Sequence, residues 1–116
     1  MRQLPPGEVV FTLECEPEWA SIEGNCSAID DETDKEVEDW IRDQLSRGNE
    51  WAWCSVVVRA RWNGFEGSDC LGRCSYVCEA DFRAGGYFDD MKAAALAELN
   101  RHIQATAQRL EELEER

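Results

Sequence analysis

The chain has 116 residues, of which 12 are basic and 25 are acidic, so its formal net charge is −13. This length predicts a single domain over residues 1–116. The carboxylate excess argues strongly against direct binding of nucleic acid, which requires Lys and Arg on one face, and against docking on anionic membranes. No apolar run reaches the ~20 residues of a membrane span. The first residues also lack the apolar stretch of a secretion signal, so we expect a cytoplasmic protein.

The acidic charge is concentrated in the first half of the chain. Residues 1–50 carry 14 acidic and 4 basic side chains, and the densest run extends from Asp30 to Asp43. One interpretation is a solvated helix face with favourable charge at its N-terminus. The other is a surface that competes with a polyanion for a basic groove. The candidate partner-binding acids are Asp30, Asp31, Glu32, Asp34, Glu38 and Asp39.

The N-terminal third predicts one strand, a loop and one helix. Residues 8–15 have strand composition and are followed by Pro17, and residues 19–23 are a candidate second short strand. Residues 24–32 have loop composition. Thr33 and Glu36 have the spacing of a capping box, which predicts a helix over about residues 34–47 with Gly48 at its C′ position.

The central region predicts a β-hairpin. Two β-rich runs, about residues 51–62 and 65–76, flank Asn63-Gly64, the dipeptide that favours a two-residue type I′ turn. With that turn, paired residue numbers sum to 127, which places Arg61 opposite Glu66 as a cross-strand ion pair. The same register places Trp51, Trp53 and Tyr76 on one face of the sheet.

The C-terminal region predicts a long helix. A short helical turn is expected within residues 75–82, a break at residues 85–86, and a helix over about residues 87–114, roughly 40 Å long at ~1.5 Å per residue. The predicted fold class is therefore α+β, with an antiparallel sheet built on the hairpin and the N-terminal strand. Residues 104–116 are expected to form a projecting helical end. A heptad-like apolar seam along this helix, a candidate self-association surface, contains Leu96, Leu99, Ile103, Leu110 and Leu113.

Aromatic side chains are the second candidate for partner binding. The chain has five Trp residues, and Trp is enriched at binding hot spots. If Trp51, Trp53 and Tyr76 share an uncovered face, they form an interaction patch. The alternative is that the first helix or the N-terminal strand covers them.

Six cysteines allow three interpretations. An absent secretion signal favours reduced thiols over disulfides. Cys70, Cys74 and Cys78 have a spacing that suggests zinc, but on a strand Cys70 and Cys74 would lie roughly 13 Å apart at ~3.3 Å per residue. We therefore expect free thiols, no metal and no cofactor.

Catalysis has little support in the sequence. His102 is the single histidine, and no local signature pairs it with a cysteine. Carboxylate pairs are expected by chance at this acidic density, and no glycine-rich phosphate loop follows a strand. We therefore expect a protein that is not an enzyme.

Three stretches carry a resemblance to known proteins. They are Gly48-Asn49-Glu50-Trp51-Ala52-Trp53-Cys54, the region from Trp62-Asn63-Gly64-Phe65 to Tyr76, and Gly85-Gly86-Tyr87-Phe88-Asp89-Asp90-Met91. Together they resemble a group of small acidic proteins of phages and mobile elements, over roughly residues 8–103. The resemblance implies a bacterial host cytoplasm, and by analogy of size and charge an inhibitor of the anti-CRISPR or anti-restriction type. It implies no site residues.

Besides a small metal-dependent protein that would use Cys70, Cys74 and Cys78, the sequence leads to two functional hypotheses. The first is a non-enzymatic, anti-CRISPR-like inhibitor whose acidic surface binds the basic nucleic-acid-binding site of a host protein complex. The second is a homodimeric phage structural or accessory protein assembled through its C-terminal helix.

Overall fold

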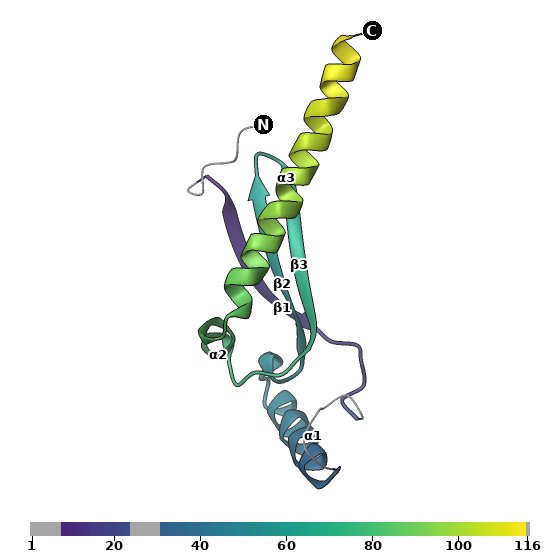
Figure 1. Cartoon of the computed structure of the whole chain (residues 1–116). Coiled ribbons are helices and arrows are strands. Elements are labelled where there is room, and N and C mark those ends of the chain that lie inside the picture. Colours follow the sequence, from purple (N-terminus) through teal and green to yellow (C-terminus); the bar gives the residue numbers. More distant parts are fainter. Residues whose placement is uncertain (1–7, 24–30, 116) are drawn as a thin grey trace. The chain divides into compact units, whose positions relative to one another are not determined.

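The computed structural model describes residues 8–23 and 31–115, and it has the α+β class that the sequence predicts (Figure 1). Three strands form one antiparallel sheet in the order β1-β2-β3, with β2 in the centre. In chain order the elements are β1 (Val10–Pro17), α1 (Asp31–Ser46), the short 3-10 helix η1 (Glu50–Ala52), β2 (Cys54–Trp62), β3 (Phe65–Cys74), α2 (Glu79–Ala84) and α3 (Tyr87–Glu114).

The described residues divide into two compact units, and each strand contributes residues to both. The helical-tail unit contains residues 8–13, 57–70 and 87–115. The cleft unit contains residues 14–23, 31–56 and 71–86. Each unit has its own buried apolar side chains, for example Val58 and Leu99 in the first and Ile41 and Phe82 in the second.

The β2–β3 turn in the helical-tail unit is the predicted type I′ turn. Asn63 and Gly64 both have positive φ angles, of 48° and 86°. This backbone geometry matches the right-handed twist of the two strands. The predicted Arg61–Glu66 pair is also confirmed, because Arg61 Nε lies 2.8 Å from Glu66 Oε1.

Helix α3 packs closely on the sheet at Gly67. A Cβ atom built on Gly67 would collide with the backbone oxygen of Ala95 and the backbone nitrogen of Leu99. Gly67 is therefore required by the close approach of two backbones. The buried α3 side chains Met91, Ala95 and Leu99 follow the 3.6-residue repeat of a helix face that covers a sheet.

Helix α1 ends in the cleft unit as its sequence predicts. The N–H of Asn49 donates to the Gln44 carbonyl (2.9 Å), and the N–H of Gly48 donates to the Leu45 carbonyl (3.0 Å). Gly48 has a φ angle of 88°. This pattern is a Schellman motif with glycine at C′.

Several predicted boundaries were wrong. Strand β1 covers Val10–Pro17 instead of residues 8–15, β3 ends at Cys74 instead of residue 76, and the helical turn expected within residues 75–82 is α2 (Glu79–Ala84). Helix α1 begins at Asp31, so Thr33 lies inside the helix instead of capping it, and acidic residues occupy the positions where a helix N-terminus favours negative charge. Residues 50–52 form η1, so β2 begins at Cys54, not at Trp51. Residues 19–23 are not a strand, because the Glu18 carboxylate accepts the N–H of Ala20 (3.0 Å) and turns the chain.

Candidate functional site

Glu18 is the polar centre of the cleft unit. Its Oε2 accepts the Ser55 hydroxyl (2.6 Å) and the backbone N–H of Arg73 (3.1 Å), and its Oε1 accepts the N–H of Ala20. These donors lower the pKa of the Glu18 carboxyl, with the Ser55 hydrogen bond the largest cause. The carboxylate is therefore held ionised and in one orientation.

A cleft opens beside Glu18. It has a volume of about 240 Å³ and lies between the end of β1, the C-terminal part of α1 and the η1 segment. Its apolar lining comes from Pro17, Leu45 and Trp53. Its carboxylates come from Glu16, Glu18 and Glu50, and none of its lining residues is basic.

Three thiols, Cys15, Cys54 and Cys74, belong to the same unit as the cleft, and Cys15 is one of its lining residues. Burial raises the pKa of Cys54 far above its usual range, and its hydrogen bond with Cys15 raises it further. Burial also raises the pKa values of Cys15 and Cys74. All three remain neutral thiols near pH 7, so they are poor nucleophiles and leave the negative charge of the cleft to its carboxylates.

The acidic candidates of α1 differ in exposure. Asp39 is exposed, with 62% of its side-chain surface accessible, whereas only 12% of the Glu38 side-chain surface is accessible. Asp34 is half-buried, and its Oδ1 has no hydrogen-bond partner among the described residues. Asp30 lies outside the described residues, and the side chains of Asp31 and Glu32 are likewise not described.

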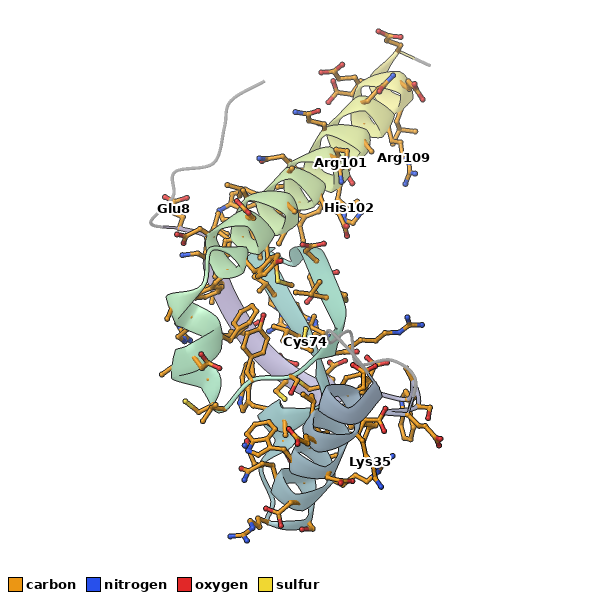
Figure 2. All side chains as sticks on the ribbon, turned by 60° about the horizontal axis from the view of Figure 1, so that its bottom comes forward. Glu8, Lys35, Cys74, Arg101, His102 and Arg109 are labelled. Atoms are coloured by element: carbon orange, nitrogen blue, oxygen red, sulfur yellow. The ribbon has the colours of Figure 1, made fainter. Side chains whose placement is uncertain are left out.

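Sequence reasoning did not select two other exposed acids of α1, Glu36 and Asp43. With Asp39 they have the i, i+3, i+7 spacing of residues on one helix face. We call Glu36, Asp39 and Asp43 the acidic stripe. Figure 2 shows α1 with the exposed Lys35, the residue that precedes the stripe.

The aromatic candidates are mostly covered. Trp53 is only 6% exposed, and its indole N–H donates to the Ala20 carbonyl (3.0 Å). Trp51 and Tyr76 are half-buried, and both rings pack on Phe82 of α2, at centroid distances of 5.8 and 5.1 Å. The prediction that these three side chains share one face of the sheet was wrong, because Trp51 lies in η1, Trp53 precedes β2 and Tyr76 follows β3. The predicted partners Trp51 and Tyr76 are still joined by one hydrogen bond, from the Tyr76 N–H to the Trp51 carbonyl (2.7 Å).

Trp19 is the exposed aromatic side chain that sequence reasoning missed. It is 91% exposed and directly follows Glu18. Its signal in the sequence was weak, because the same residue was also the start of a candidate strand. A large apolar side chain with so little cover is available to a partner.

The apolar seam of α3 is divided between two environments. Leu99 is fully buried, and Leu96 and Ile103 are half-buried, whereas Leu110 and Leu113 are 56% and 65% exposed. Thr106, Arg109, Leu110 and Leu113 line a shallow groove with i, i+3, i+4, i+7 spacing. That spacing is typical of the hole that receives a side chain in a coiled coil.

His102 and the cysteines are the remaining candidates for chemistry. His102 projects from α3 (Figure 2), and its Nδ1 donates to the Glu66 carbonyl (2.7 Å), which ties α3 to β3. Cys15, Cys54, Cys70, Cys74 and Cys78 are free thiols, and Cys26 lies outside the described residues. Within residues 8–23 and 31–115, no group of three His, Cys, Asp or Glu residues has the arrangement to hold a metal ion.

Comparison of the chain with protein families, with curated proteins and with solved structures found no match. None of the helices in the described part of the chain is long and apolar enough to cross a membrane.

Proposed function

We propose that this chain is a non-enzymatic binding protein whose acidic face occupies a basic, nucleic-acid-binding site on a partner protein. The observation that carries the proposal is the acidic stripe, three exposed carboxylates on one face of α1. In its finer form, which follows the resemblance to phage and mobile-element proteins expected from the sequence, the proposal takes the partner to be a host defence complex and the protein an anti-CRISPR-like inhibitor.

Electrostatics favour such an encounter. A net charge of −13 on 116 residues gives a negative potential that accelerates association with a basic surface. The stripe and the carboxylates of the cleft belong to the same unit of the chain. Screening limits these interactions to about 10 Å at 0.1 M salt, so binding must weaken as salt rises.

The ion pairs that the acidic stripe forms within α1 can be replaced by ion pairs to a partner with little loss of stability. Asp39 Oδ1 lies 3.6 Å from Arg42 Nη1, and Asp43 Oδ2 lies 3.0 Å from Arg47 Nε. Exposed ion pairs within one helix contribute about 0.3–0.5 kcal/mol each. The carboxylates can therefore turn to basic side chains of a partner without a large loss of helix stability.

The test compares two charge reversals of equal size. One variant carries Glu36→Lys, Asp39→Lys and Asp43→Lys in the stripe, and its control carries Glu111→Lys, Glu112→Lys and Glu115→Lys at the exposed end of α3. Both variants change the net charge equally. We expect the stripe variant to lose a partner that the wild type and the control capture from bacterial lysate.

Equal capture by the stripe variant and its control would contradict the proposal. Circular dichroism of each variant checks that α1 still forms. Trp19→Ala is a further arm of the same experiment. We expect it to weaken capture without lowering stability, because its side chain is 91% exposed.

The exposed end of α3 supports a second candidate function, a homodimeric phage structural or accessory protein. Leu110 and Leu113 are large apolar side chains on the outer part of a 28-residue helix. The mass of the protein in solution discriminates between the two functions. A dimer that Ile103→Asp converts to a monomer would favour the second, and a wild-type monomer would remove it.

A further inference from the structure

The cleft in the cleft unit has the size of a side-chain receptor. Its volume of about 240 Å³ is below the roughly 300–1,000 Å³ of pockets that take a small-molecule ligand or cofactor. The lining of the cleft is amphipathic, with Leu45, Pro17 and Trp53 as apolar residues and carboxylates beside them. An occupant therefore needs an apolar stem and a positively charged end.

The charged residues that line the cleft all carry negative charge. Glu16, Glu18 and Glu50 contribute carboxylates, and no lining residue is basic. Glu18 is fixed by three hydrogen bonds from Ser55, Ala20 and Arg73, so its charge does not have to be oriented when a ligand arrives.

The carboxylates of the cleft also act on the neighbouring thiols, as smaller contributions than burial. Glu50 raises the pKa of Cys15, and Glu18 raises the pKa values of Cys54 and Cys74, in each case after the larger effect of burial. A cation in the cleft would meet the same field with the opposite, favourable sign.

We propose that the cleft receives the side chain of an arginine from the basic partner. The guanidinium would pair with the carboxylates of the cleft, and the methylene stem would lie along Leu45 and Pro17. Arginine fits better than lysine, because its planar group donates to two carboxylate oxygens at once and is more weakly hydrated. This inference rests on the proposed function, to which it adds the residue type that the partner must present.

The test uses a defined probe, a capped Gly-Arg-Gly peptide, titrated into the full, isotope-labelled chain and followed by NMR. The matched probe replaces arginine by citrulline, which has nearly the same shape and no charge. We expect the arginine peptide to shift the indole N–H of Trp53 and the amide of Ala20 in a saturable manner, because Trp53 lines the cleft and the Ala20 N–H donates to Glu18, another lining residue. Equal shifts with the citrulline peptide, or arginine-specific shifts elsewhere, would overturn the proposal.

Two variants locate the site. Glu50→Gln removes one exposed carboxylate of the cleft, and we expect it to weaken the arginine peptide roughly fivefold. Glu111→Gln removes an equally exposed carboxylate on α3 and should change the affinity less than about twofold. Equal effects of the two variants would show general charge attraction and no cleft, which overturns the inference.

This design separates the inference from the proposed function. The peptide carries one charge, so it reports on the cleft without requiring a partner or the acidic stripe. If the peptide binds at Trp53 but the stripe variant still captures its partner, the cleft inference stands and the proposed function fails. If the stripe is needed for capture but the peptide does not bind, the reverse holds.

Discussion

The two units of this chain are stabilised in different ways. In the helical-tail unit, α3 approaches the sheet so closely that Gly67 has no room for a Cβ atom. In the cleft unit, a single carboxylate, Glu18, joins three segments of the chain through hydrogen bonds to Ala20, Ser55 and Arg73. The first unit therefore depends on shape and the second partly on charge.

The two units also differ in the kind of group that their key contacts position. The contact at Gly67 positions a helix and presents no charged group. The network around Glu18 positions a carboxylate in the lining of an open cleft. We therefore expect variants at Gly67 to lose stability through disturbed packing, and variants at Glu18 to lose an amount of stability that depends on pH.

The largest expected effect is in the apolar part of the cleft unit. Phe82 is 1% exposed and contacts the rings of Trp51 and Tyr76. Phe82→Ala should lower the free energy of unfolding by about 4 kcal/mol, because it leaves a cavity under two aromatic rings. Urea unfolding measures this loss. Val77→Ala, at a 61% exposed position, is the control and should change stability little.

The next effect tests shape in the helical-tail unit. Gly67→Ala should destabilise the protein by about 3 kcal/mol, because the added methyl group meets backbone atoms of Ala95 and Leu99 that cannot move alone. Gly86→Ala is the control, since its Cβ would meet nothing within 4 Å. Equal stabilities of the two variants in thermal unfolding would mean that α3 does not pack on the sheet at Gly67.

Glu18→Gln tests charge in the cleft unit. The folded pKa of Glu18 is lowered, so its ionised form stabilises the fold above the unfolded pKa of about 4.3, and this contribution is lost as the pH falls through the folded value. We expect the variant to lose about 1 kcal/mol at pH 7 and to approach the wild type below about pH 4. Urea unfolding at several pH values checks the trend, and a difference independent of pH would contradict it.

The smallest effect concerns the thiols. At pH 8, iodoacetamide should modify the exposed Cys70 and Cys78 first and the buried Cys54 and Cys74 last, because burial raises the pKa values of the latter two and limits access. Peptide mapping by mass spectrometry gives the order. Modification of Cys54 as fast as Cys70 would mean that the centre of the cleft unit opens readily.

The sequence predicted most of the fold where the signal was local. Asn63-Gly64 predicted the type I′ turn, Gly48 predicted the end of α1, and apolar spacing predicted α3 over its full length. The start of β2 was misplaced because Trp51 has high strand propensity but lies in η1, where tertiary contacts outweigh propensity.

The candidate site was harder to predict. Glu18 lies 37 residues from Ser55 and 55 from Arg73 in sequence, so no local pattern links them. The aromatic prediction named residues that pack on Phe82 or, for Trp53, donate to the Ala20 carbonyl, whereas Trp19, in a loop, remains exposed. Charge density in α1 was visible in the sequence, but which carboxylates are exposed depends on how the helix packs.

The most direct test of the central claim is capture of a partner from bacterial lysate by the tagged wild-type protein at about 0.05 M and about 0.5 M salt, with and without added DNA duplex. An acidic face in a nucleic-acid-binding site predicts a partner that is retained at low salt, released at high salt and displaced by DNA. A partner that stays bound at high salt and is insensitive to DNA would contradict the claim.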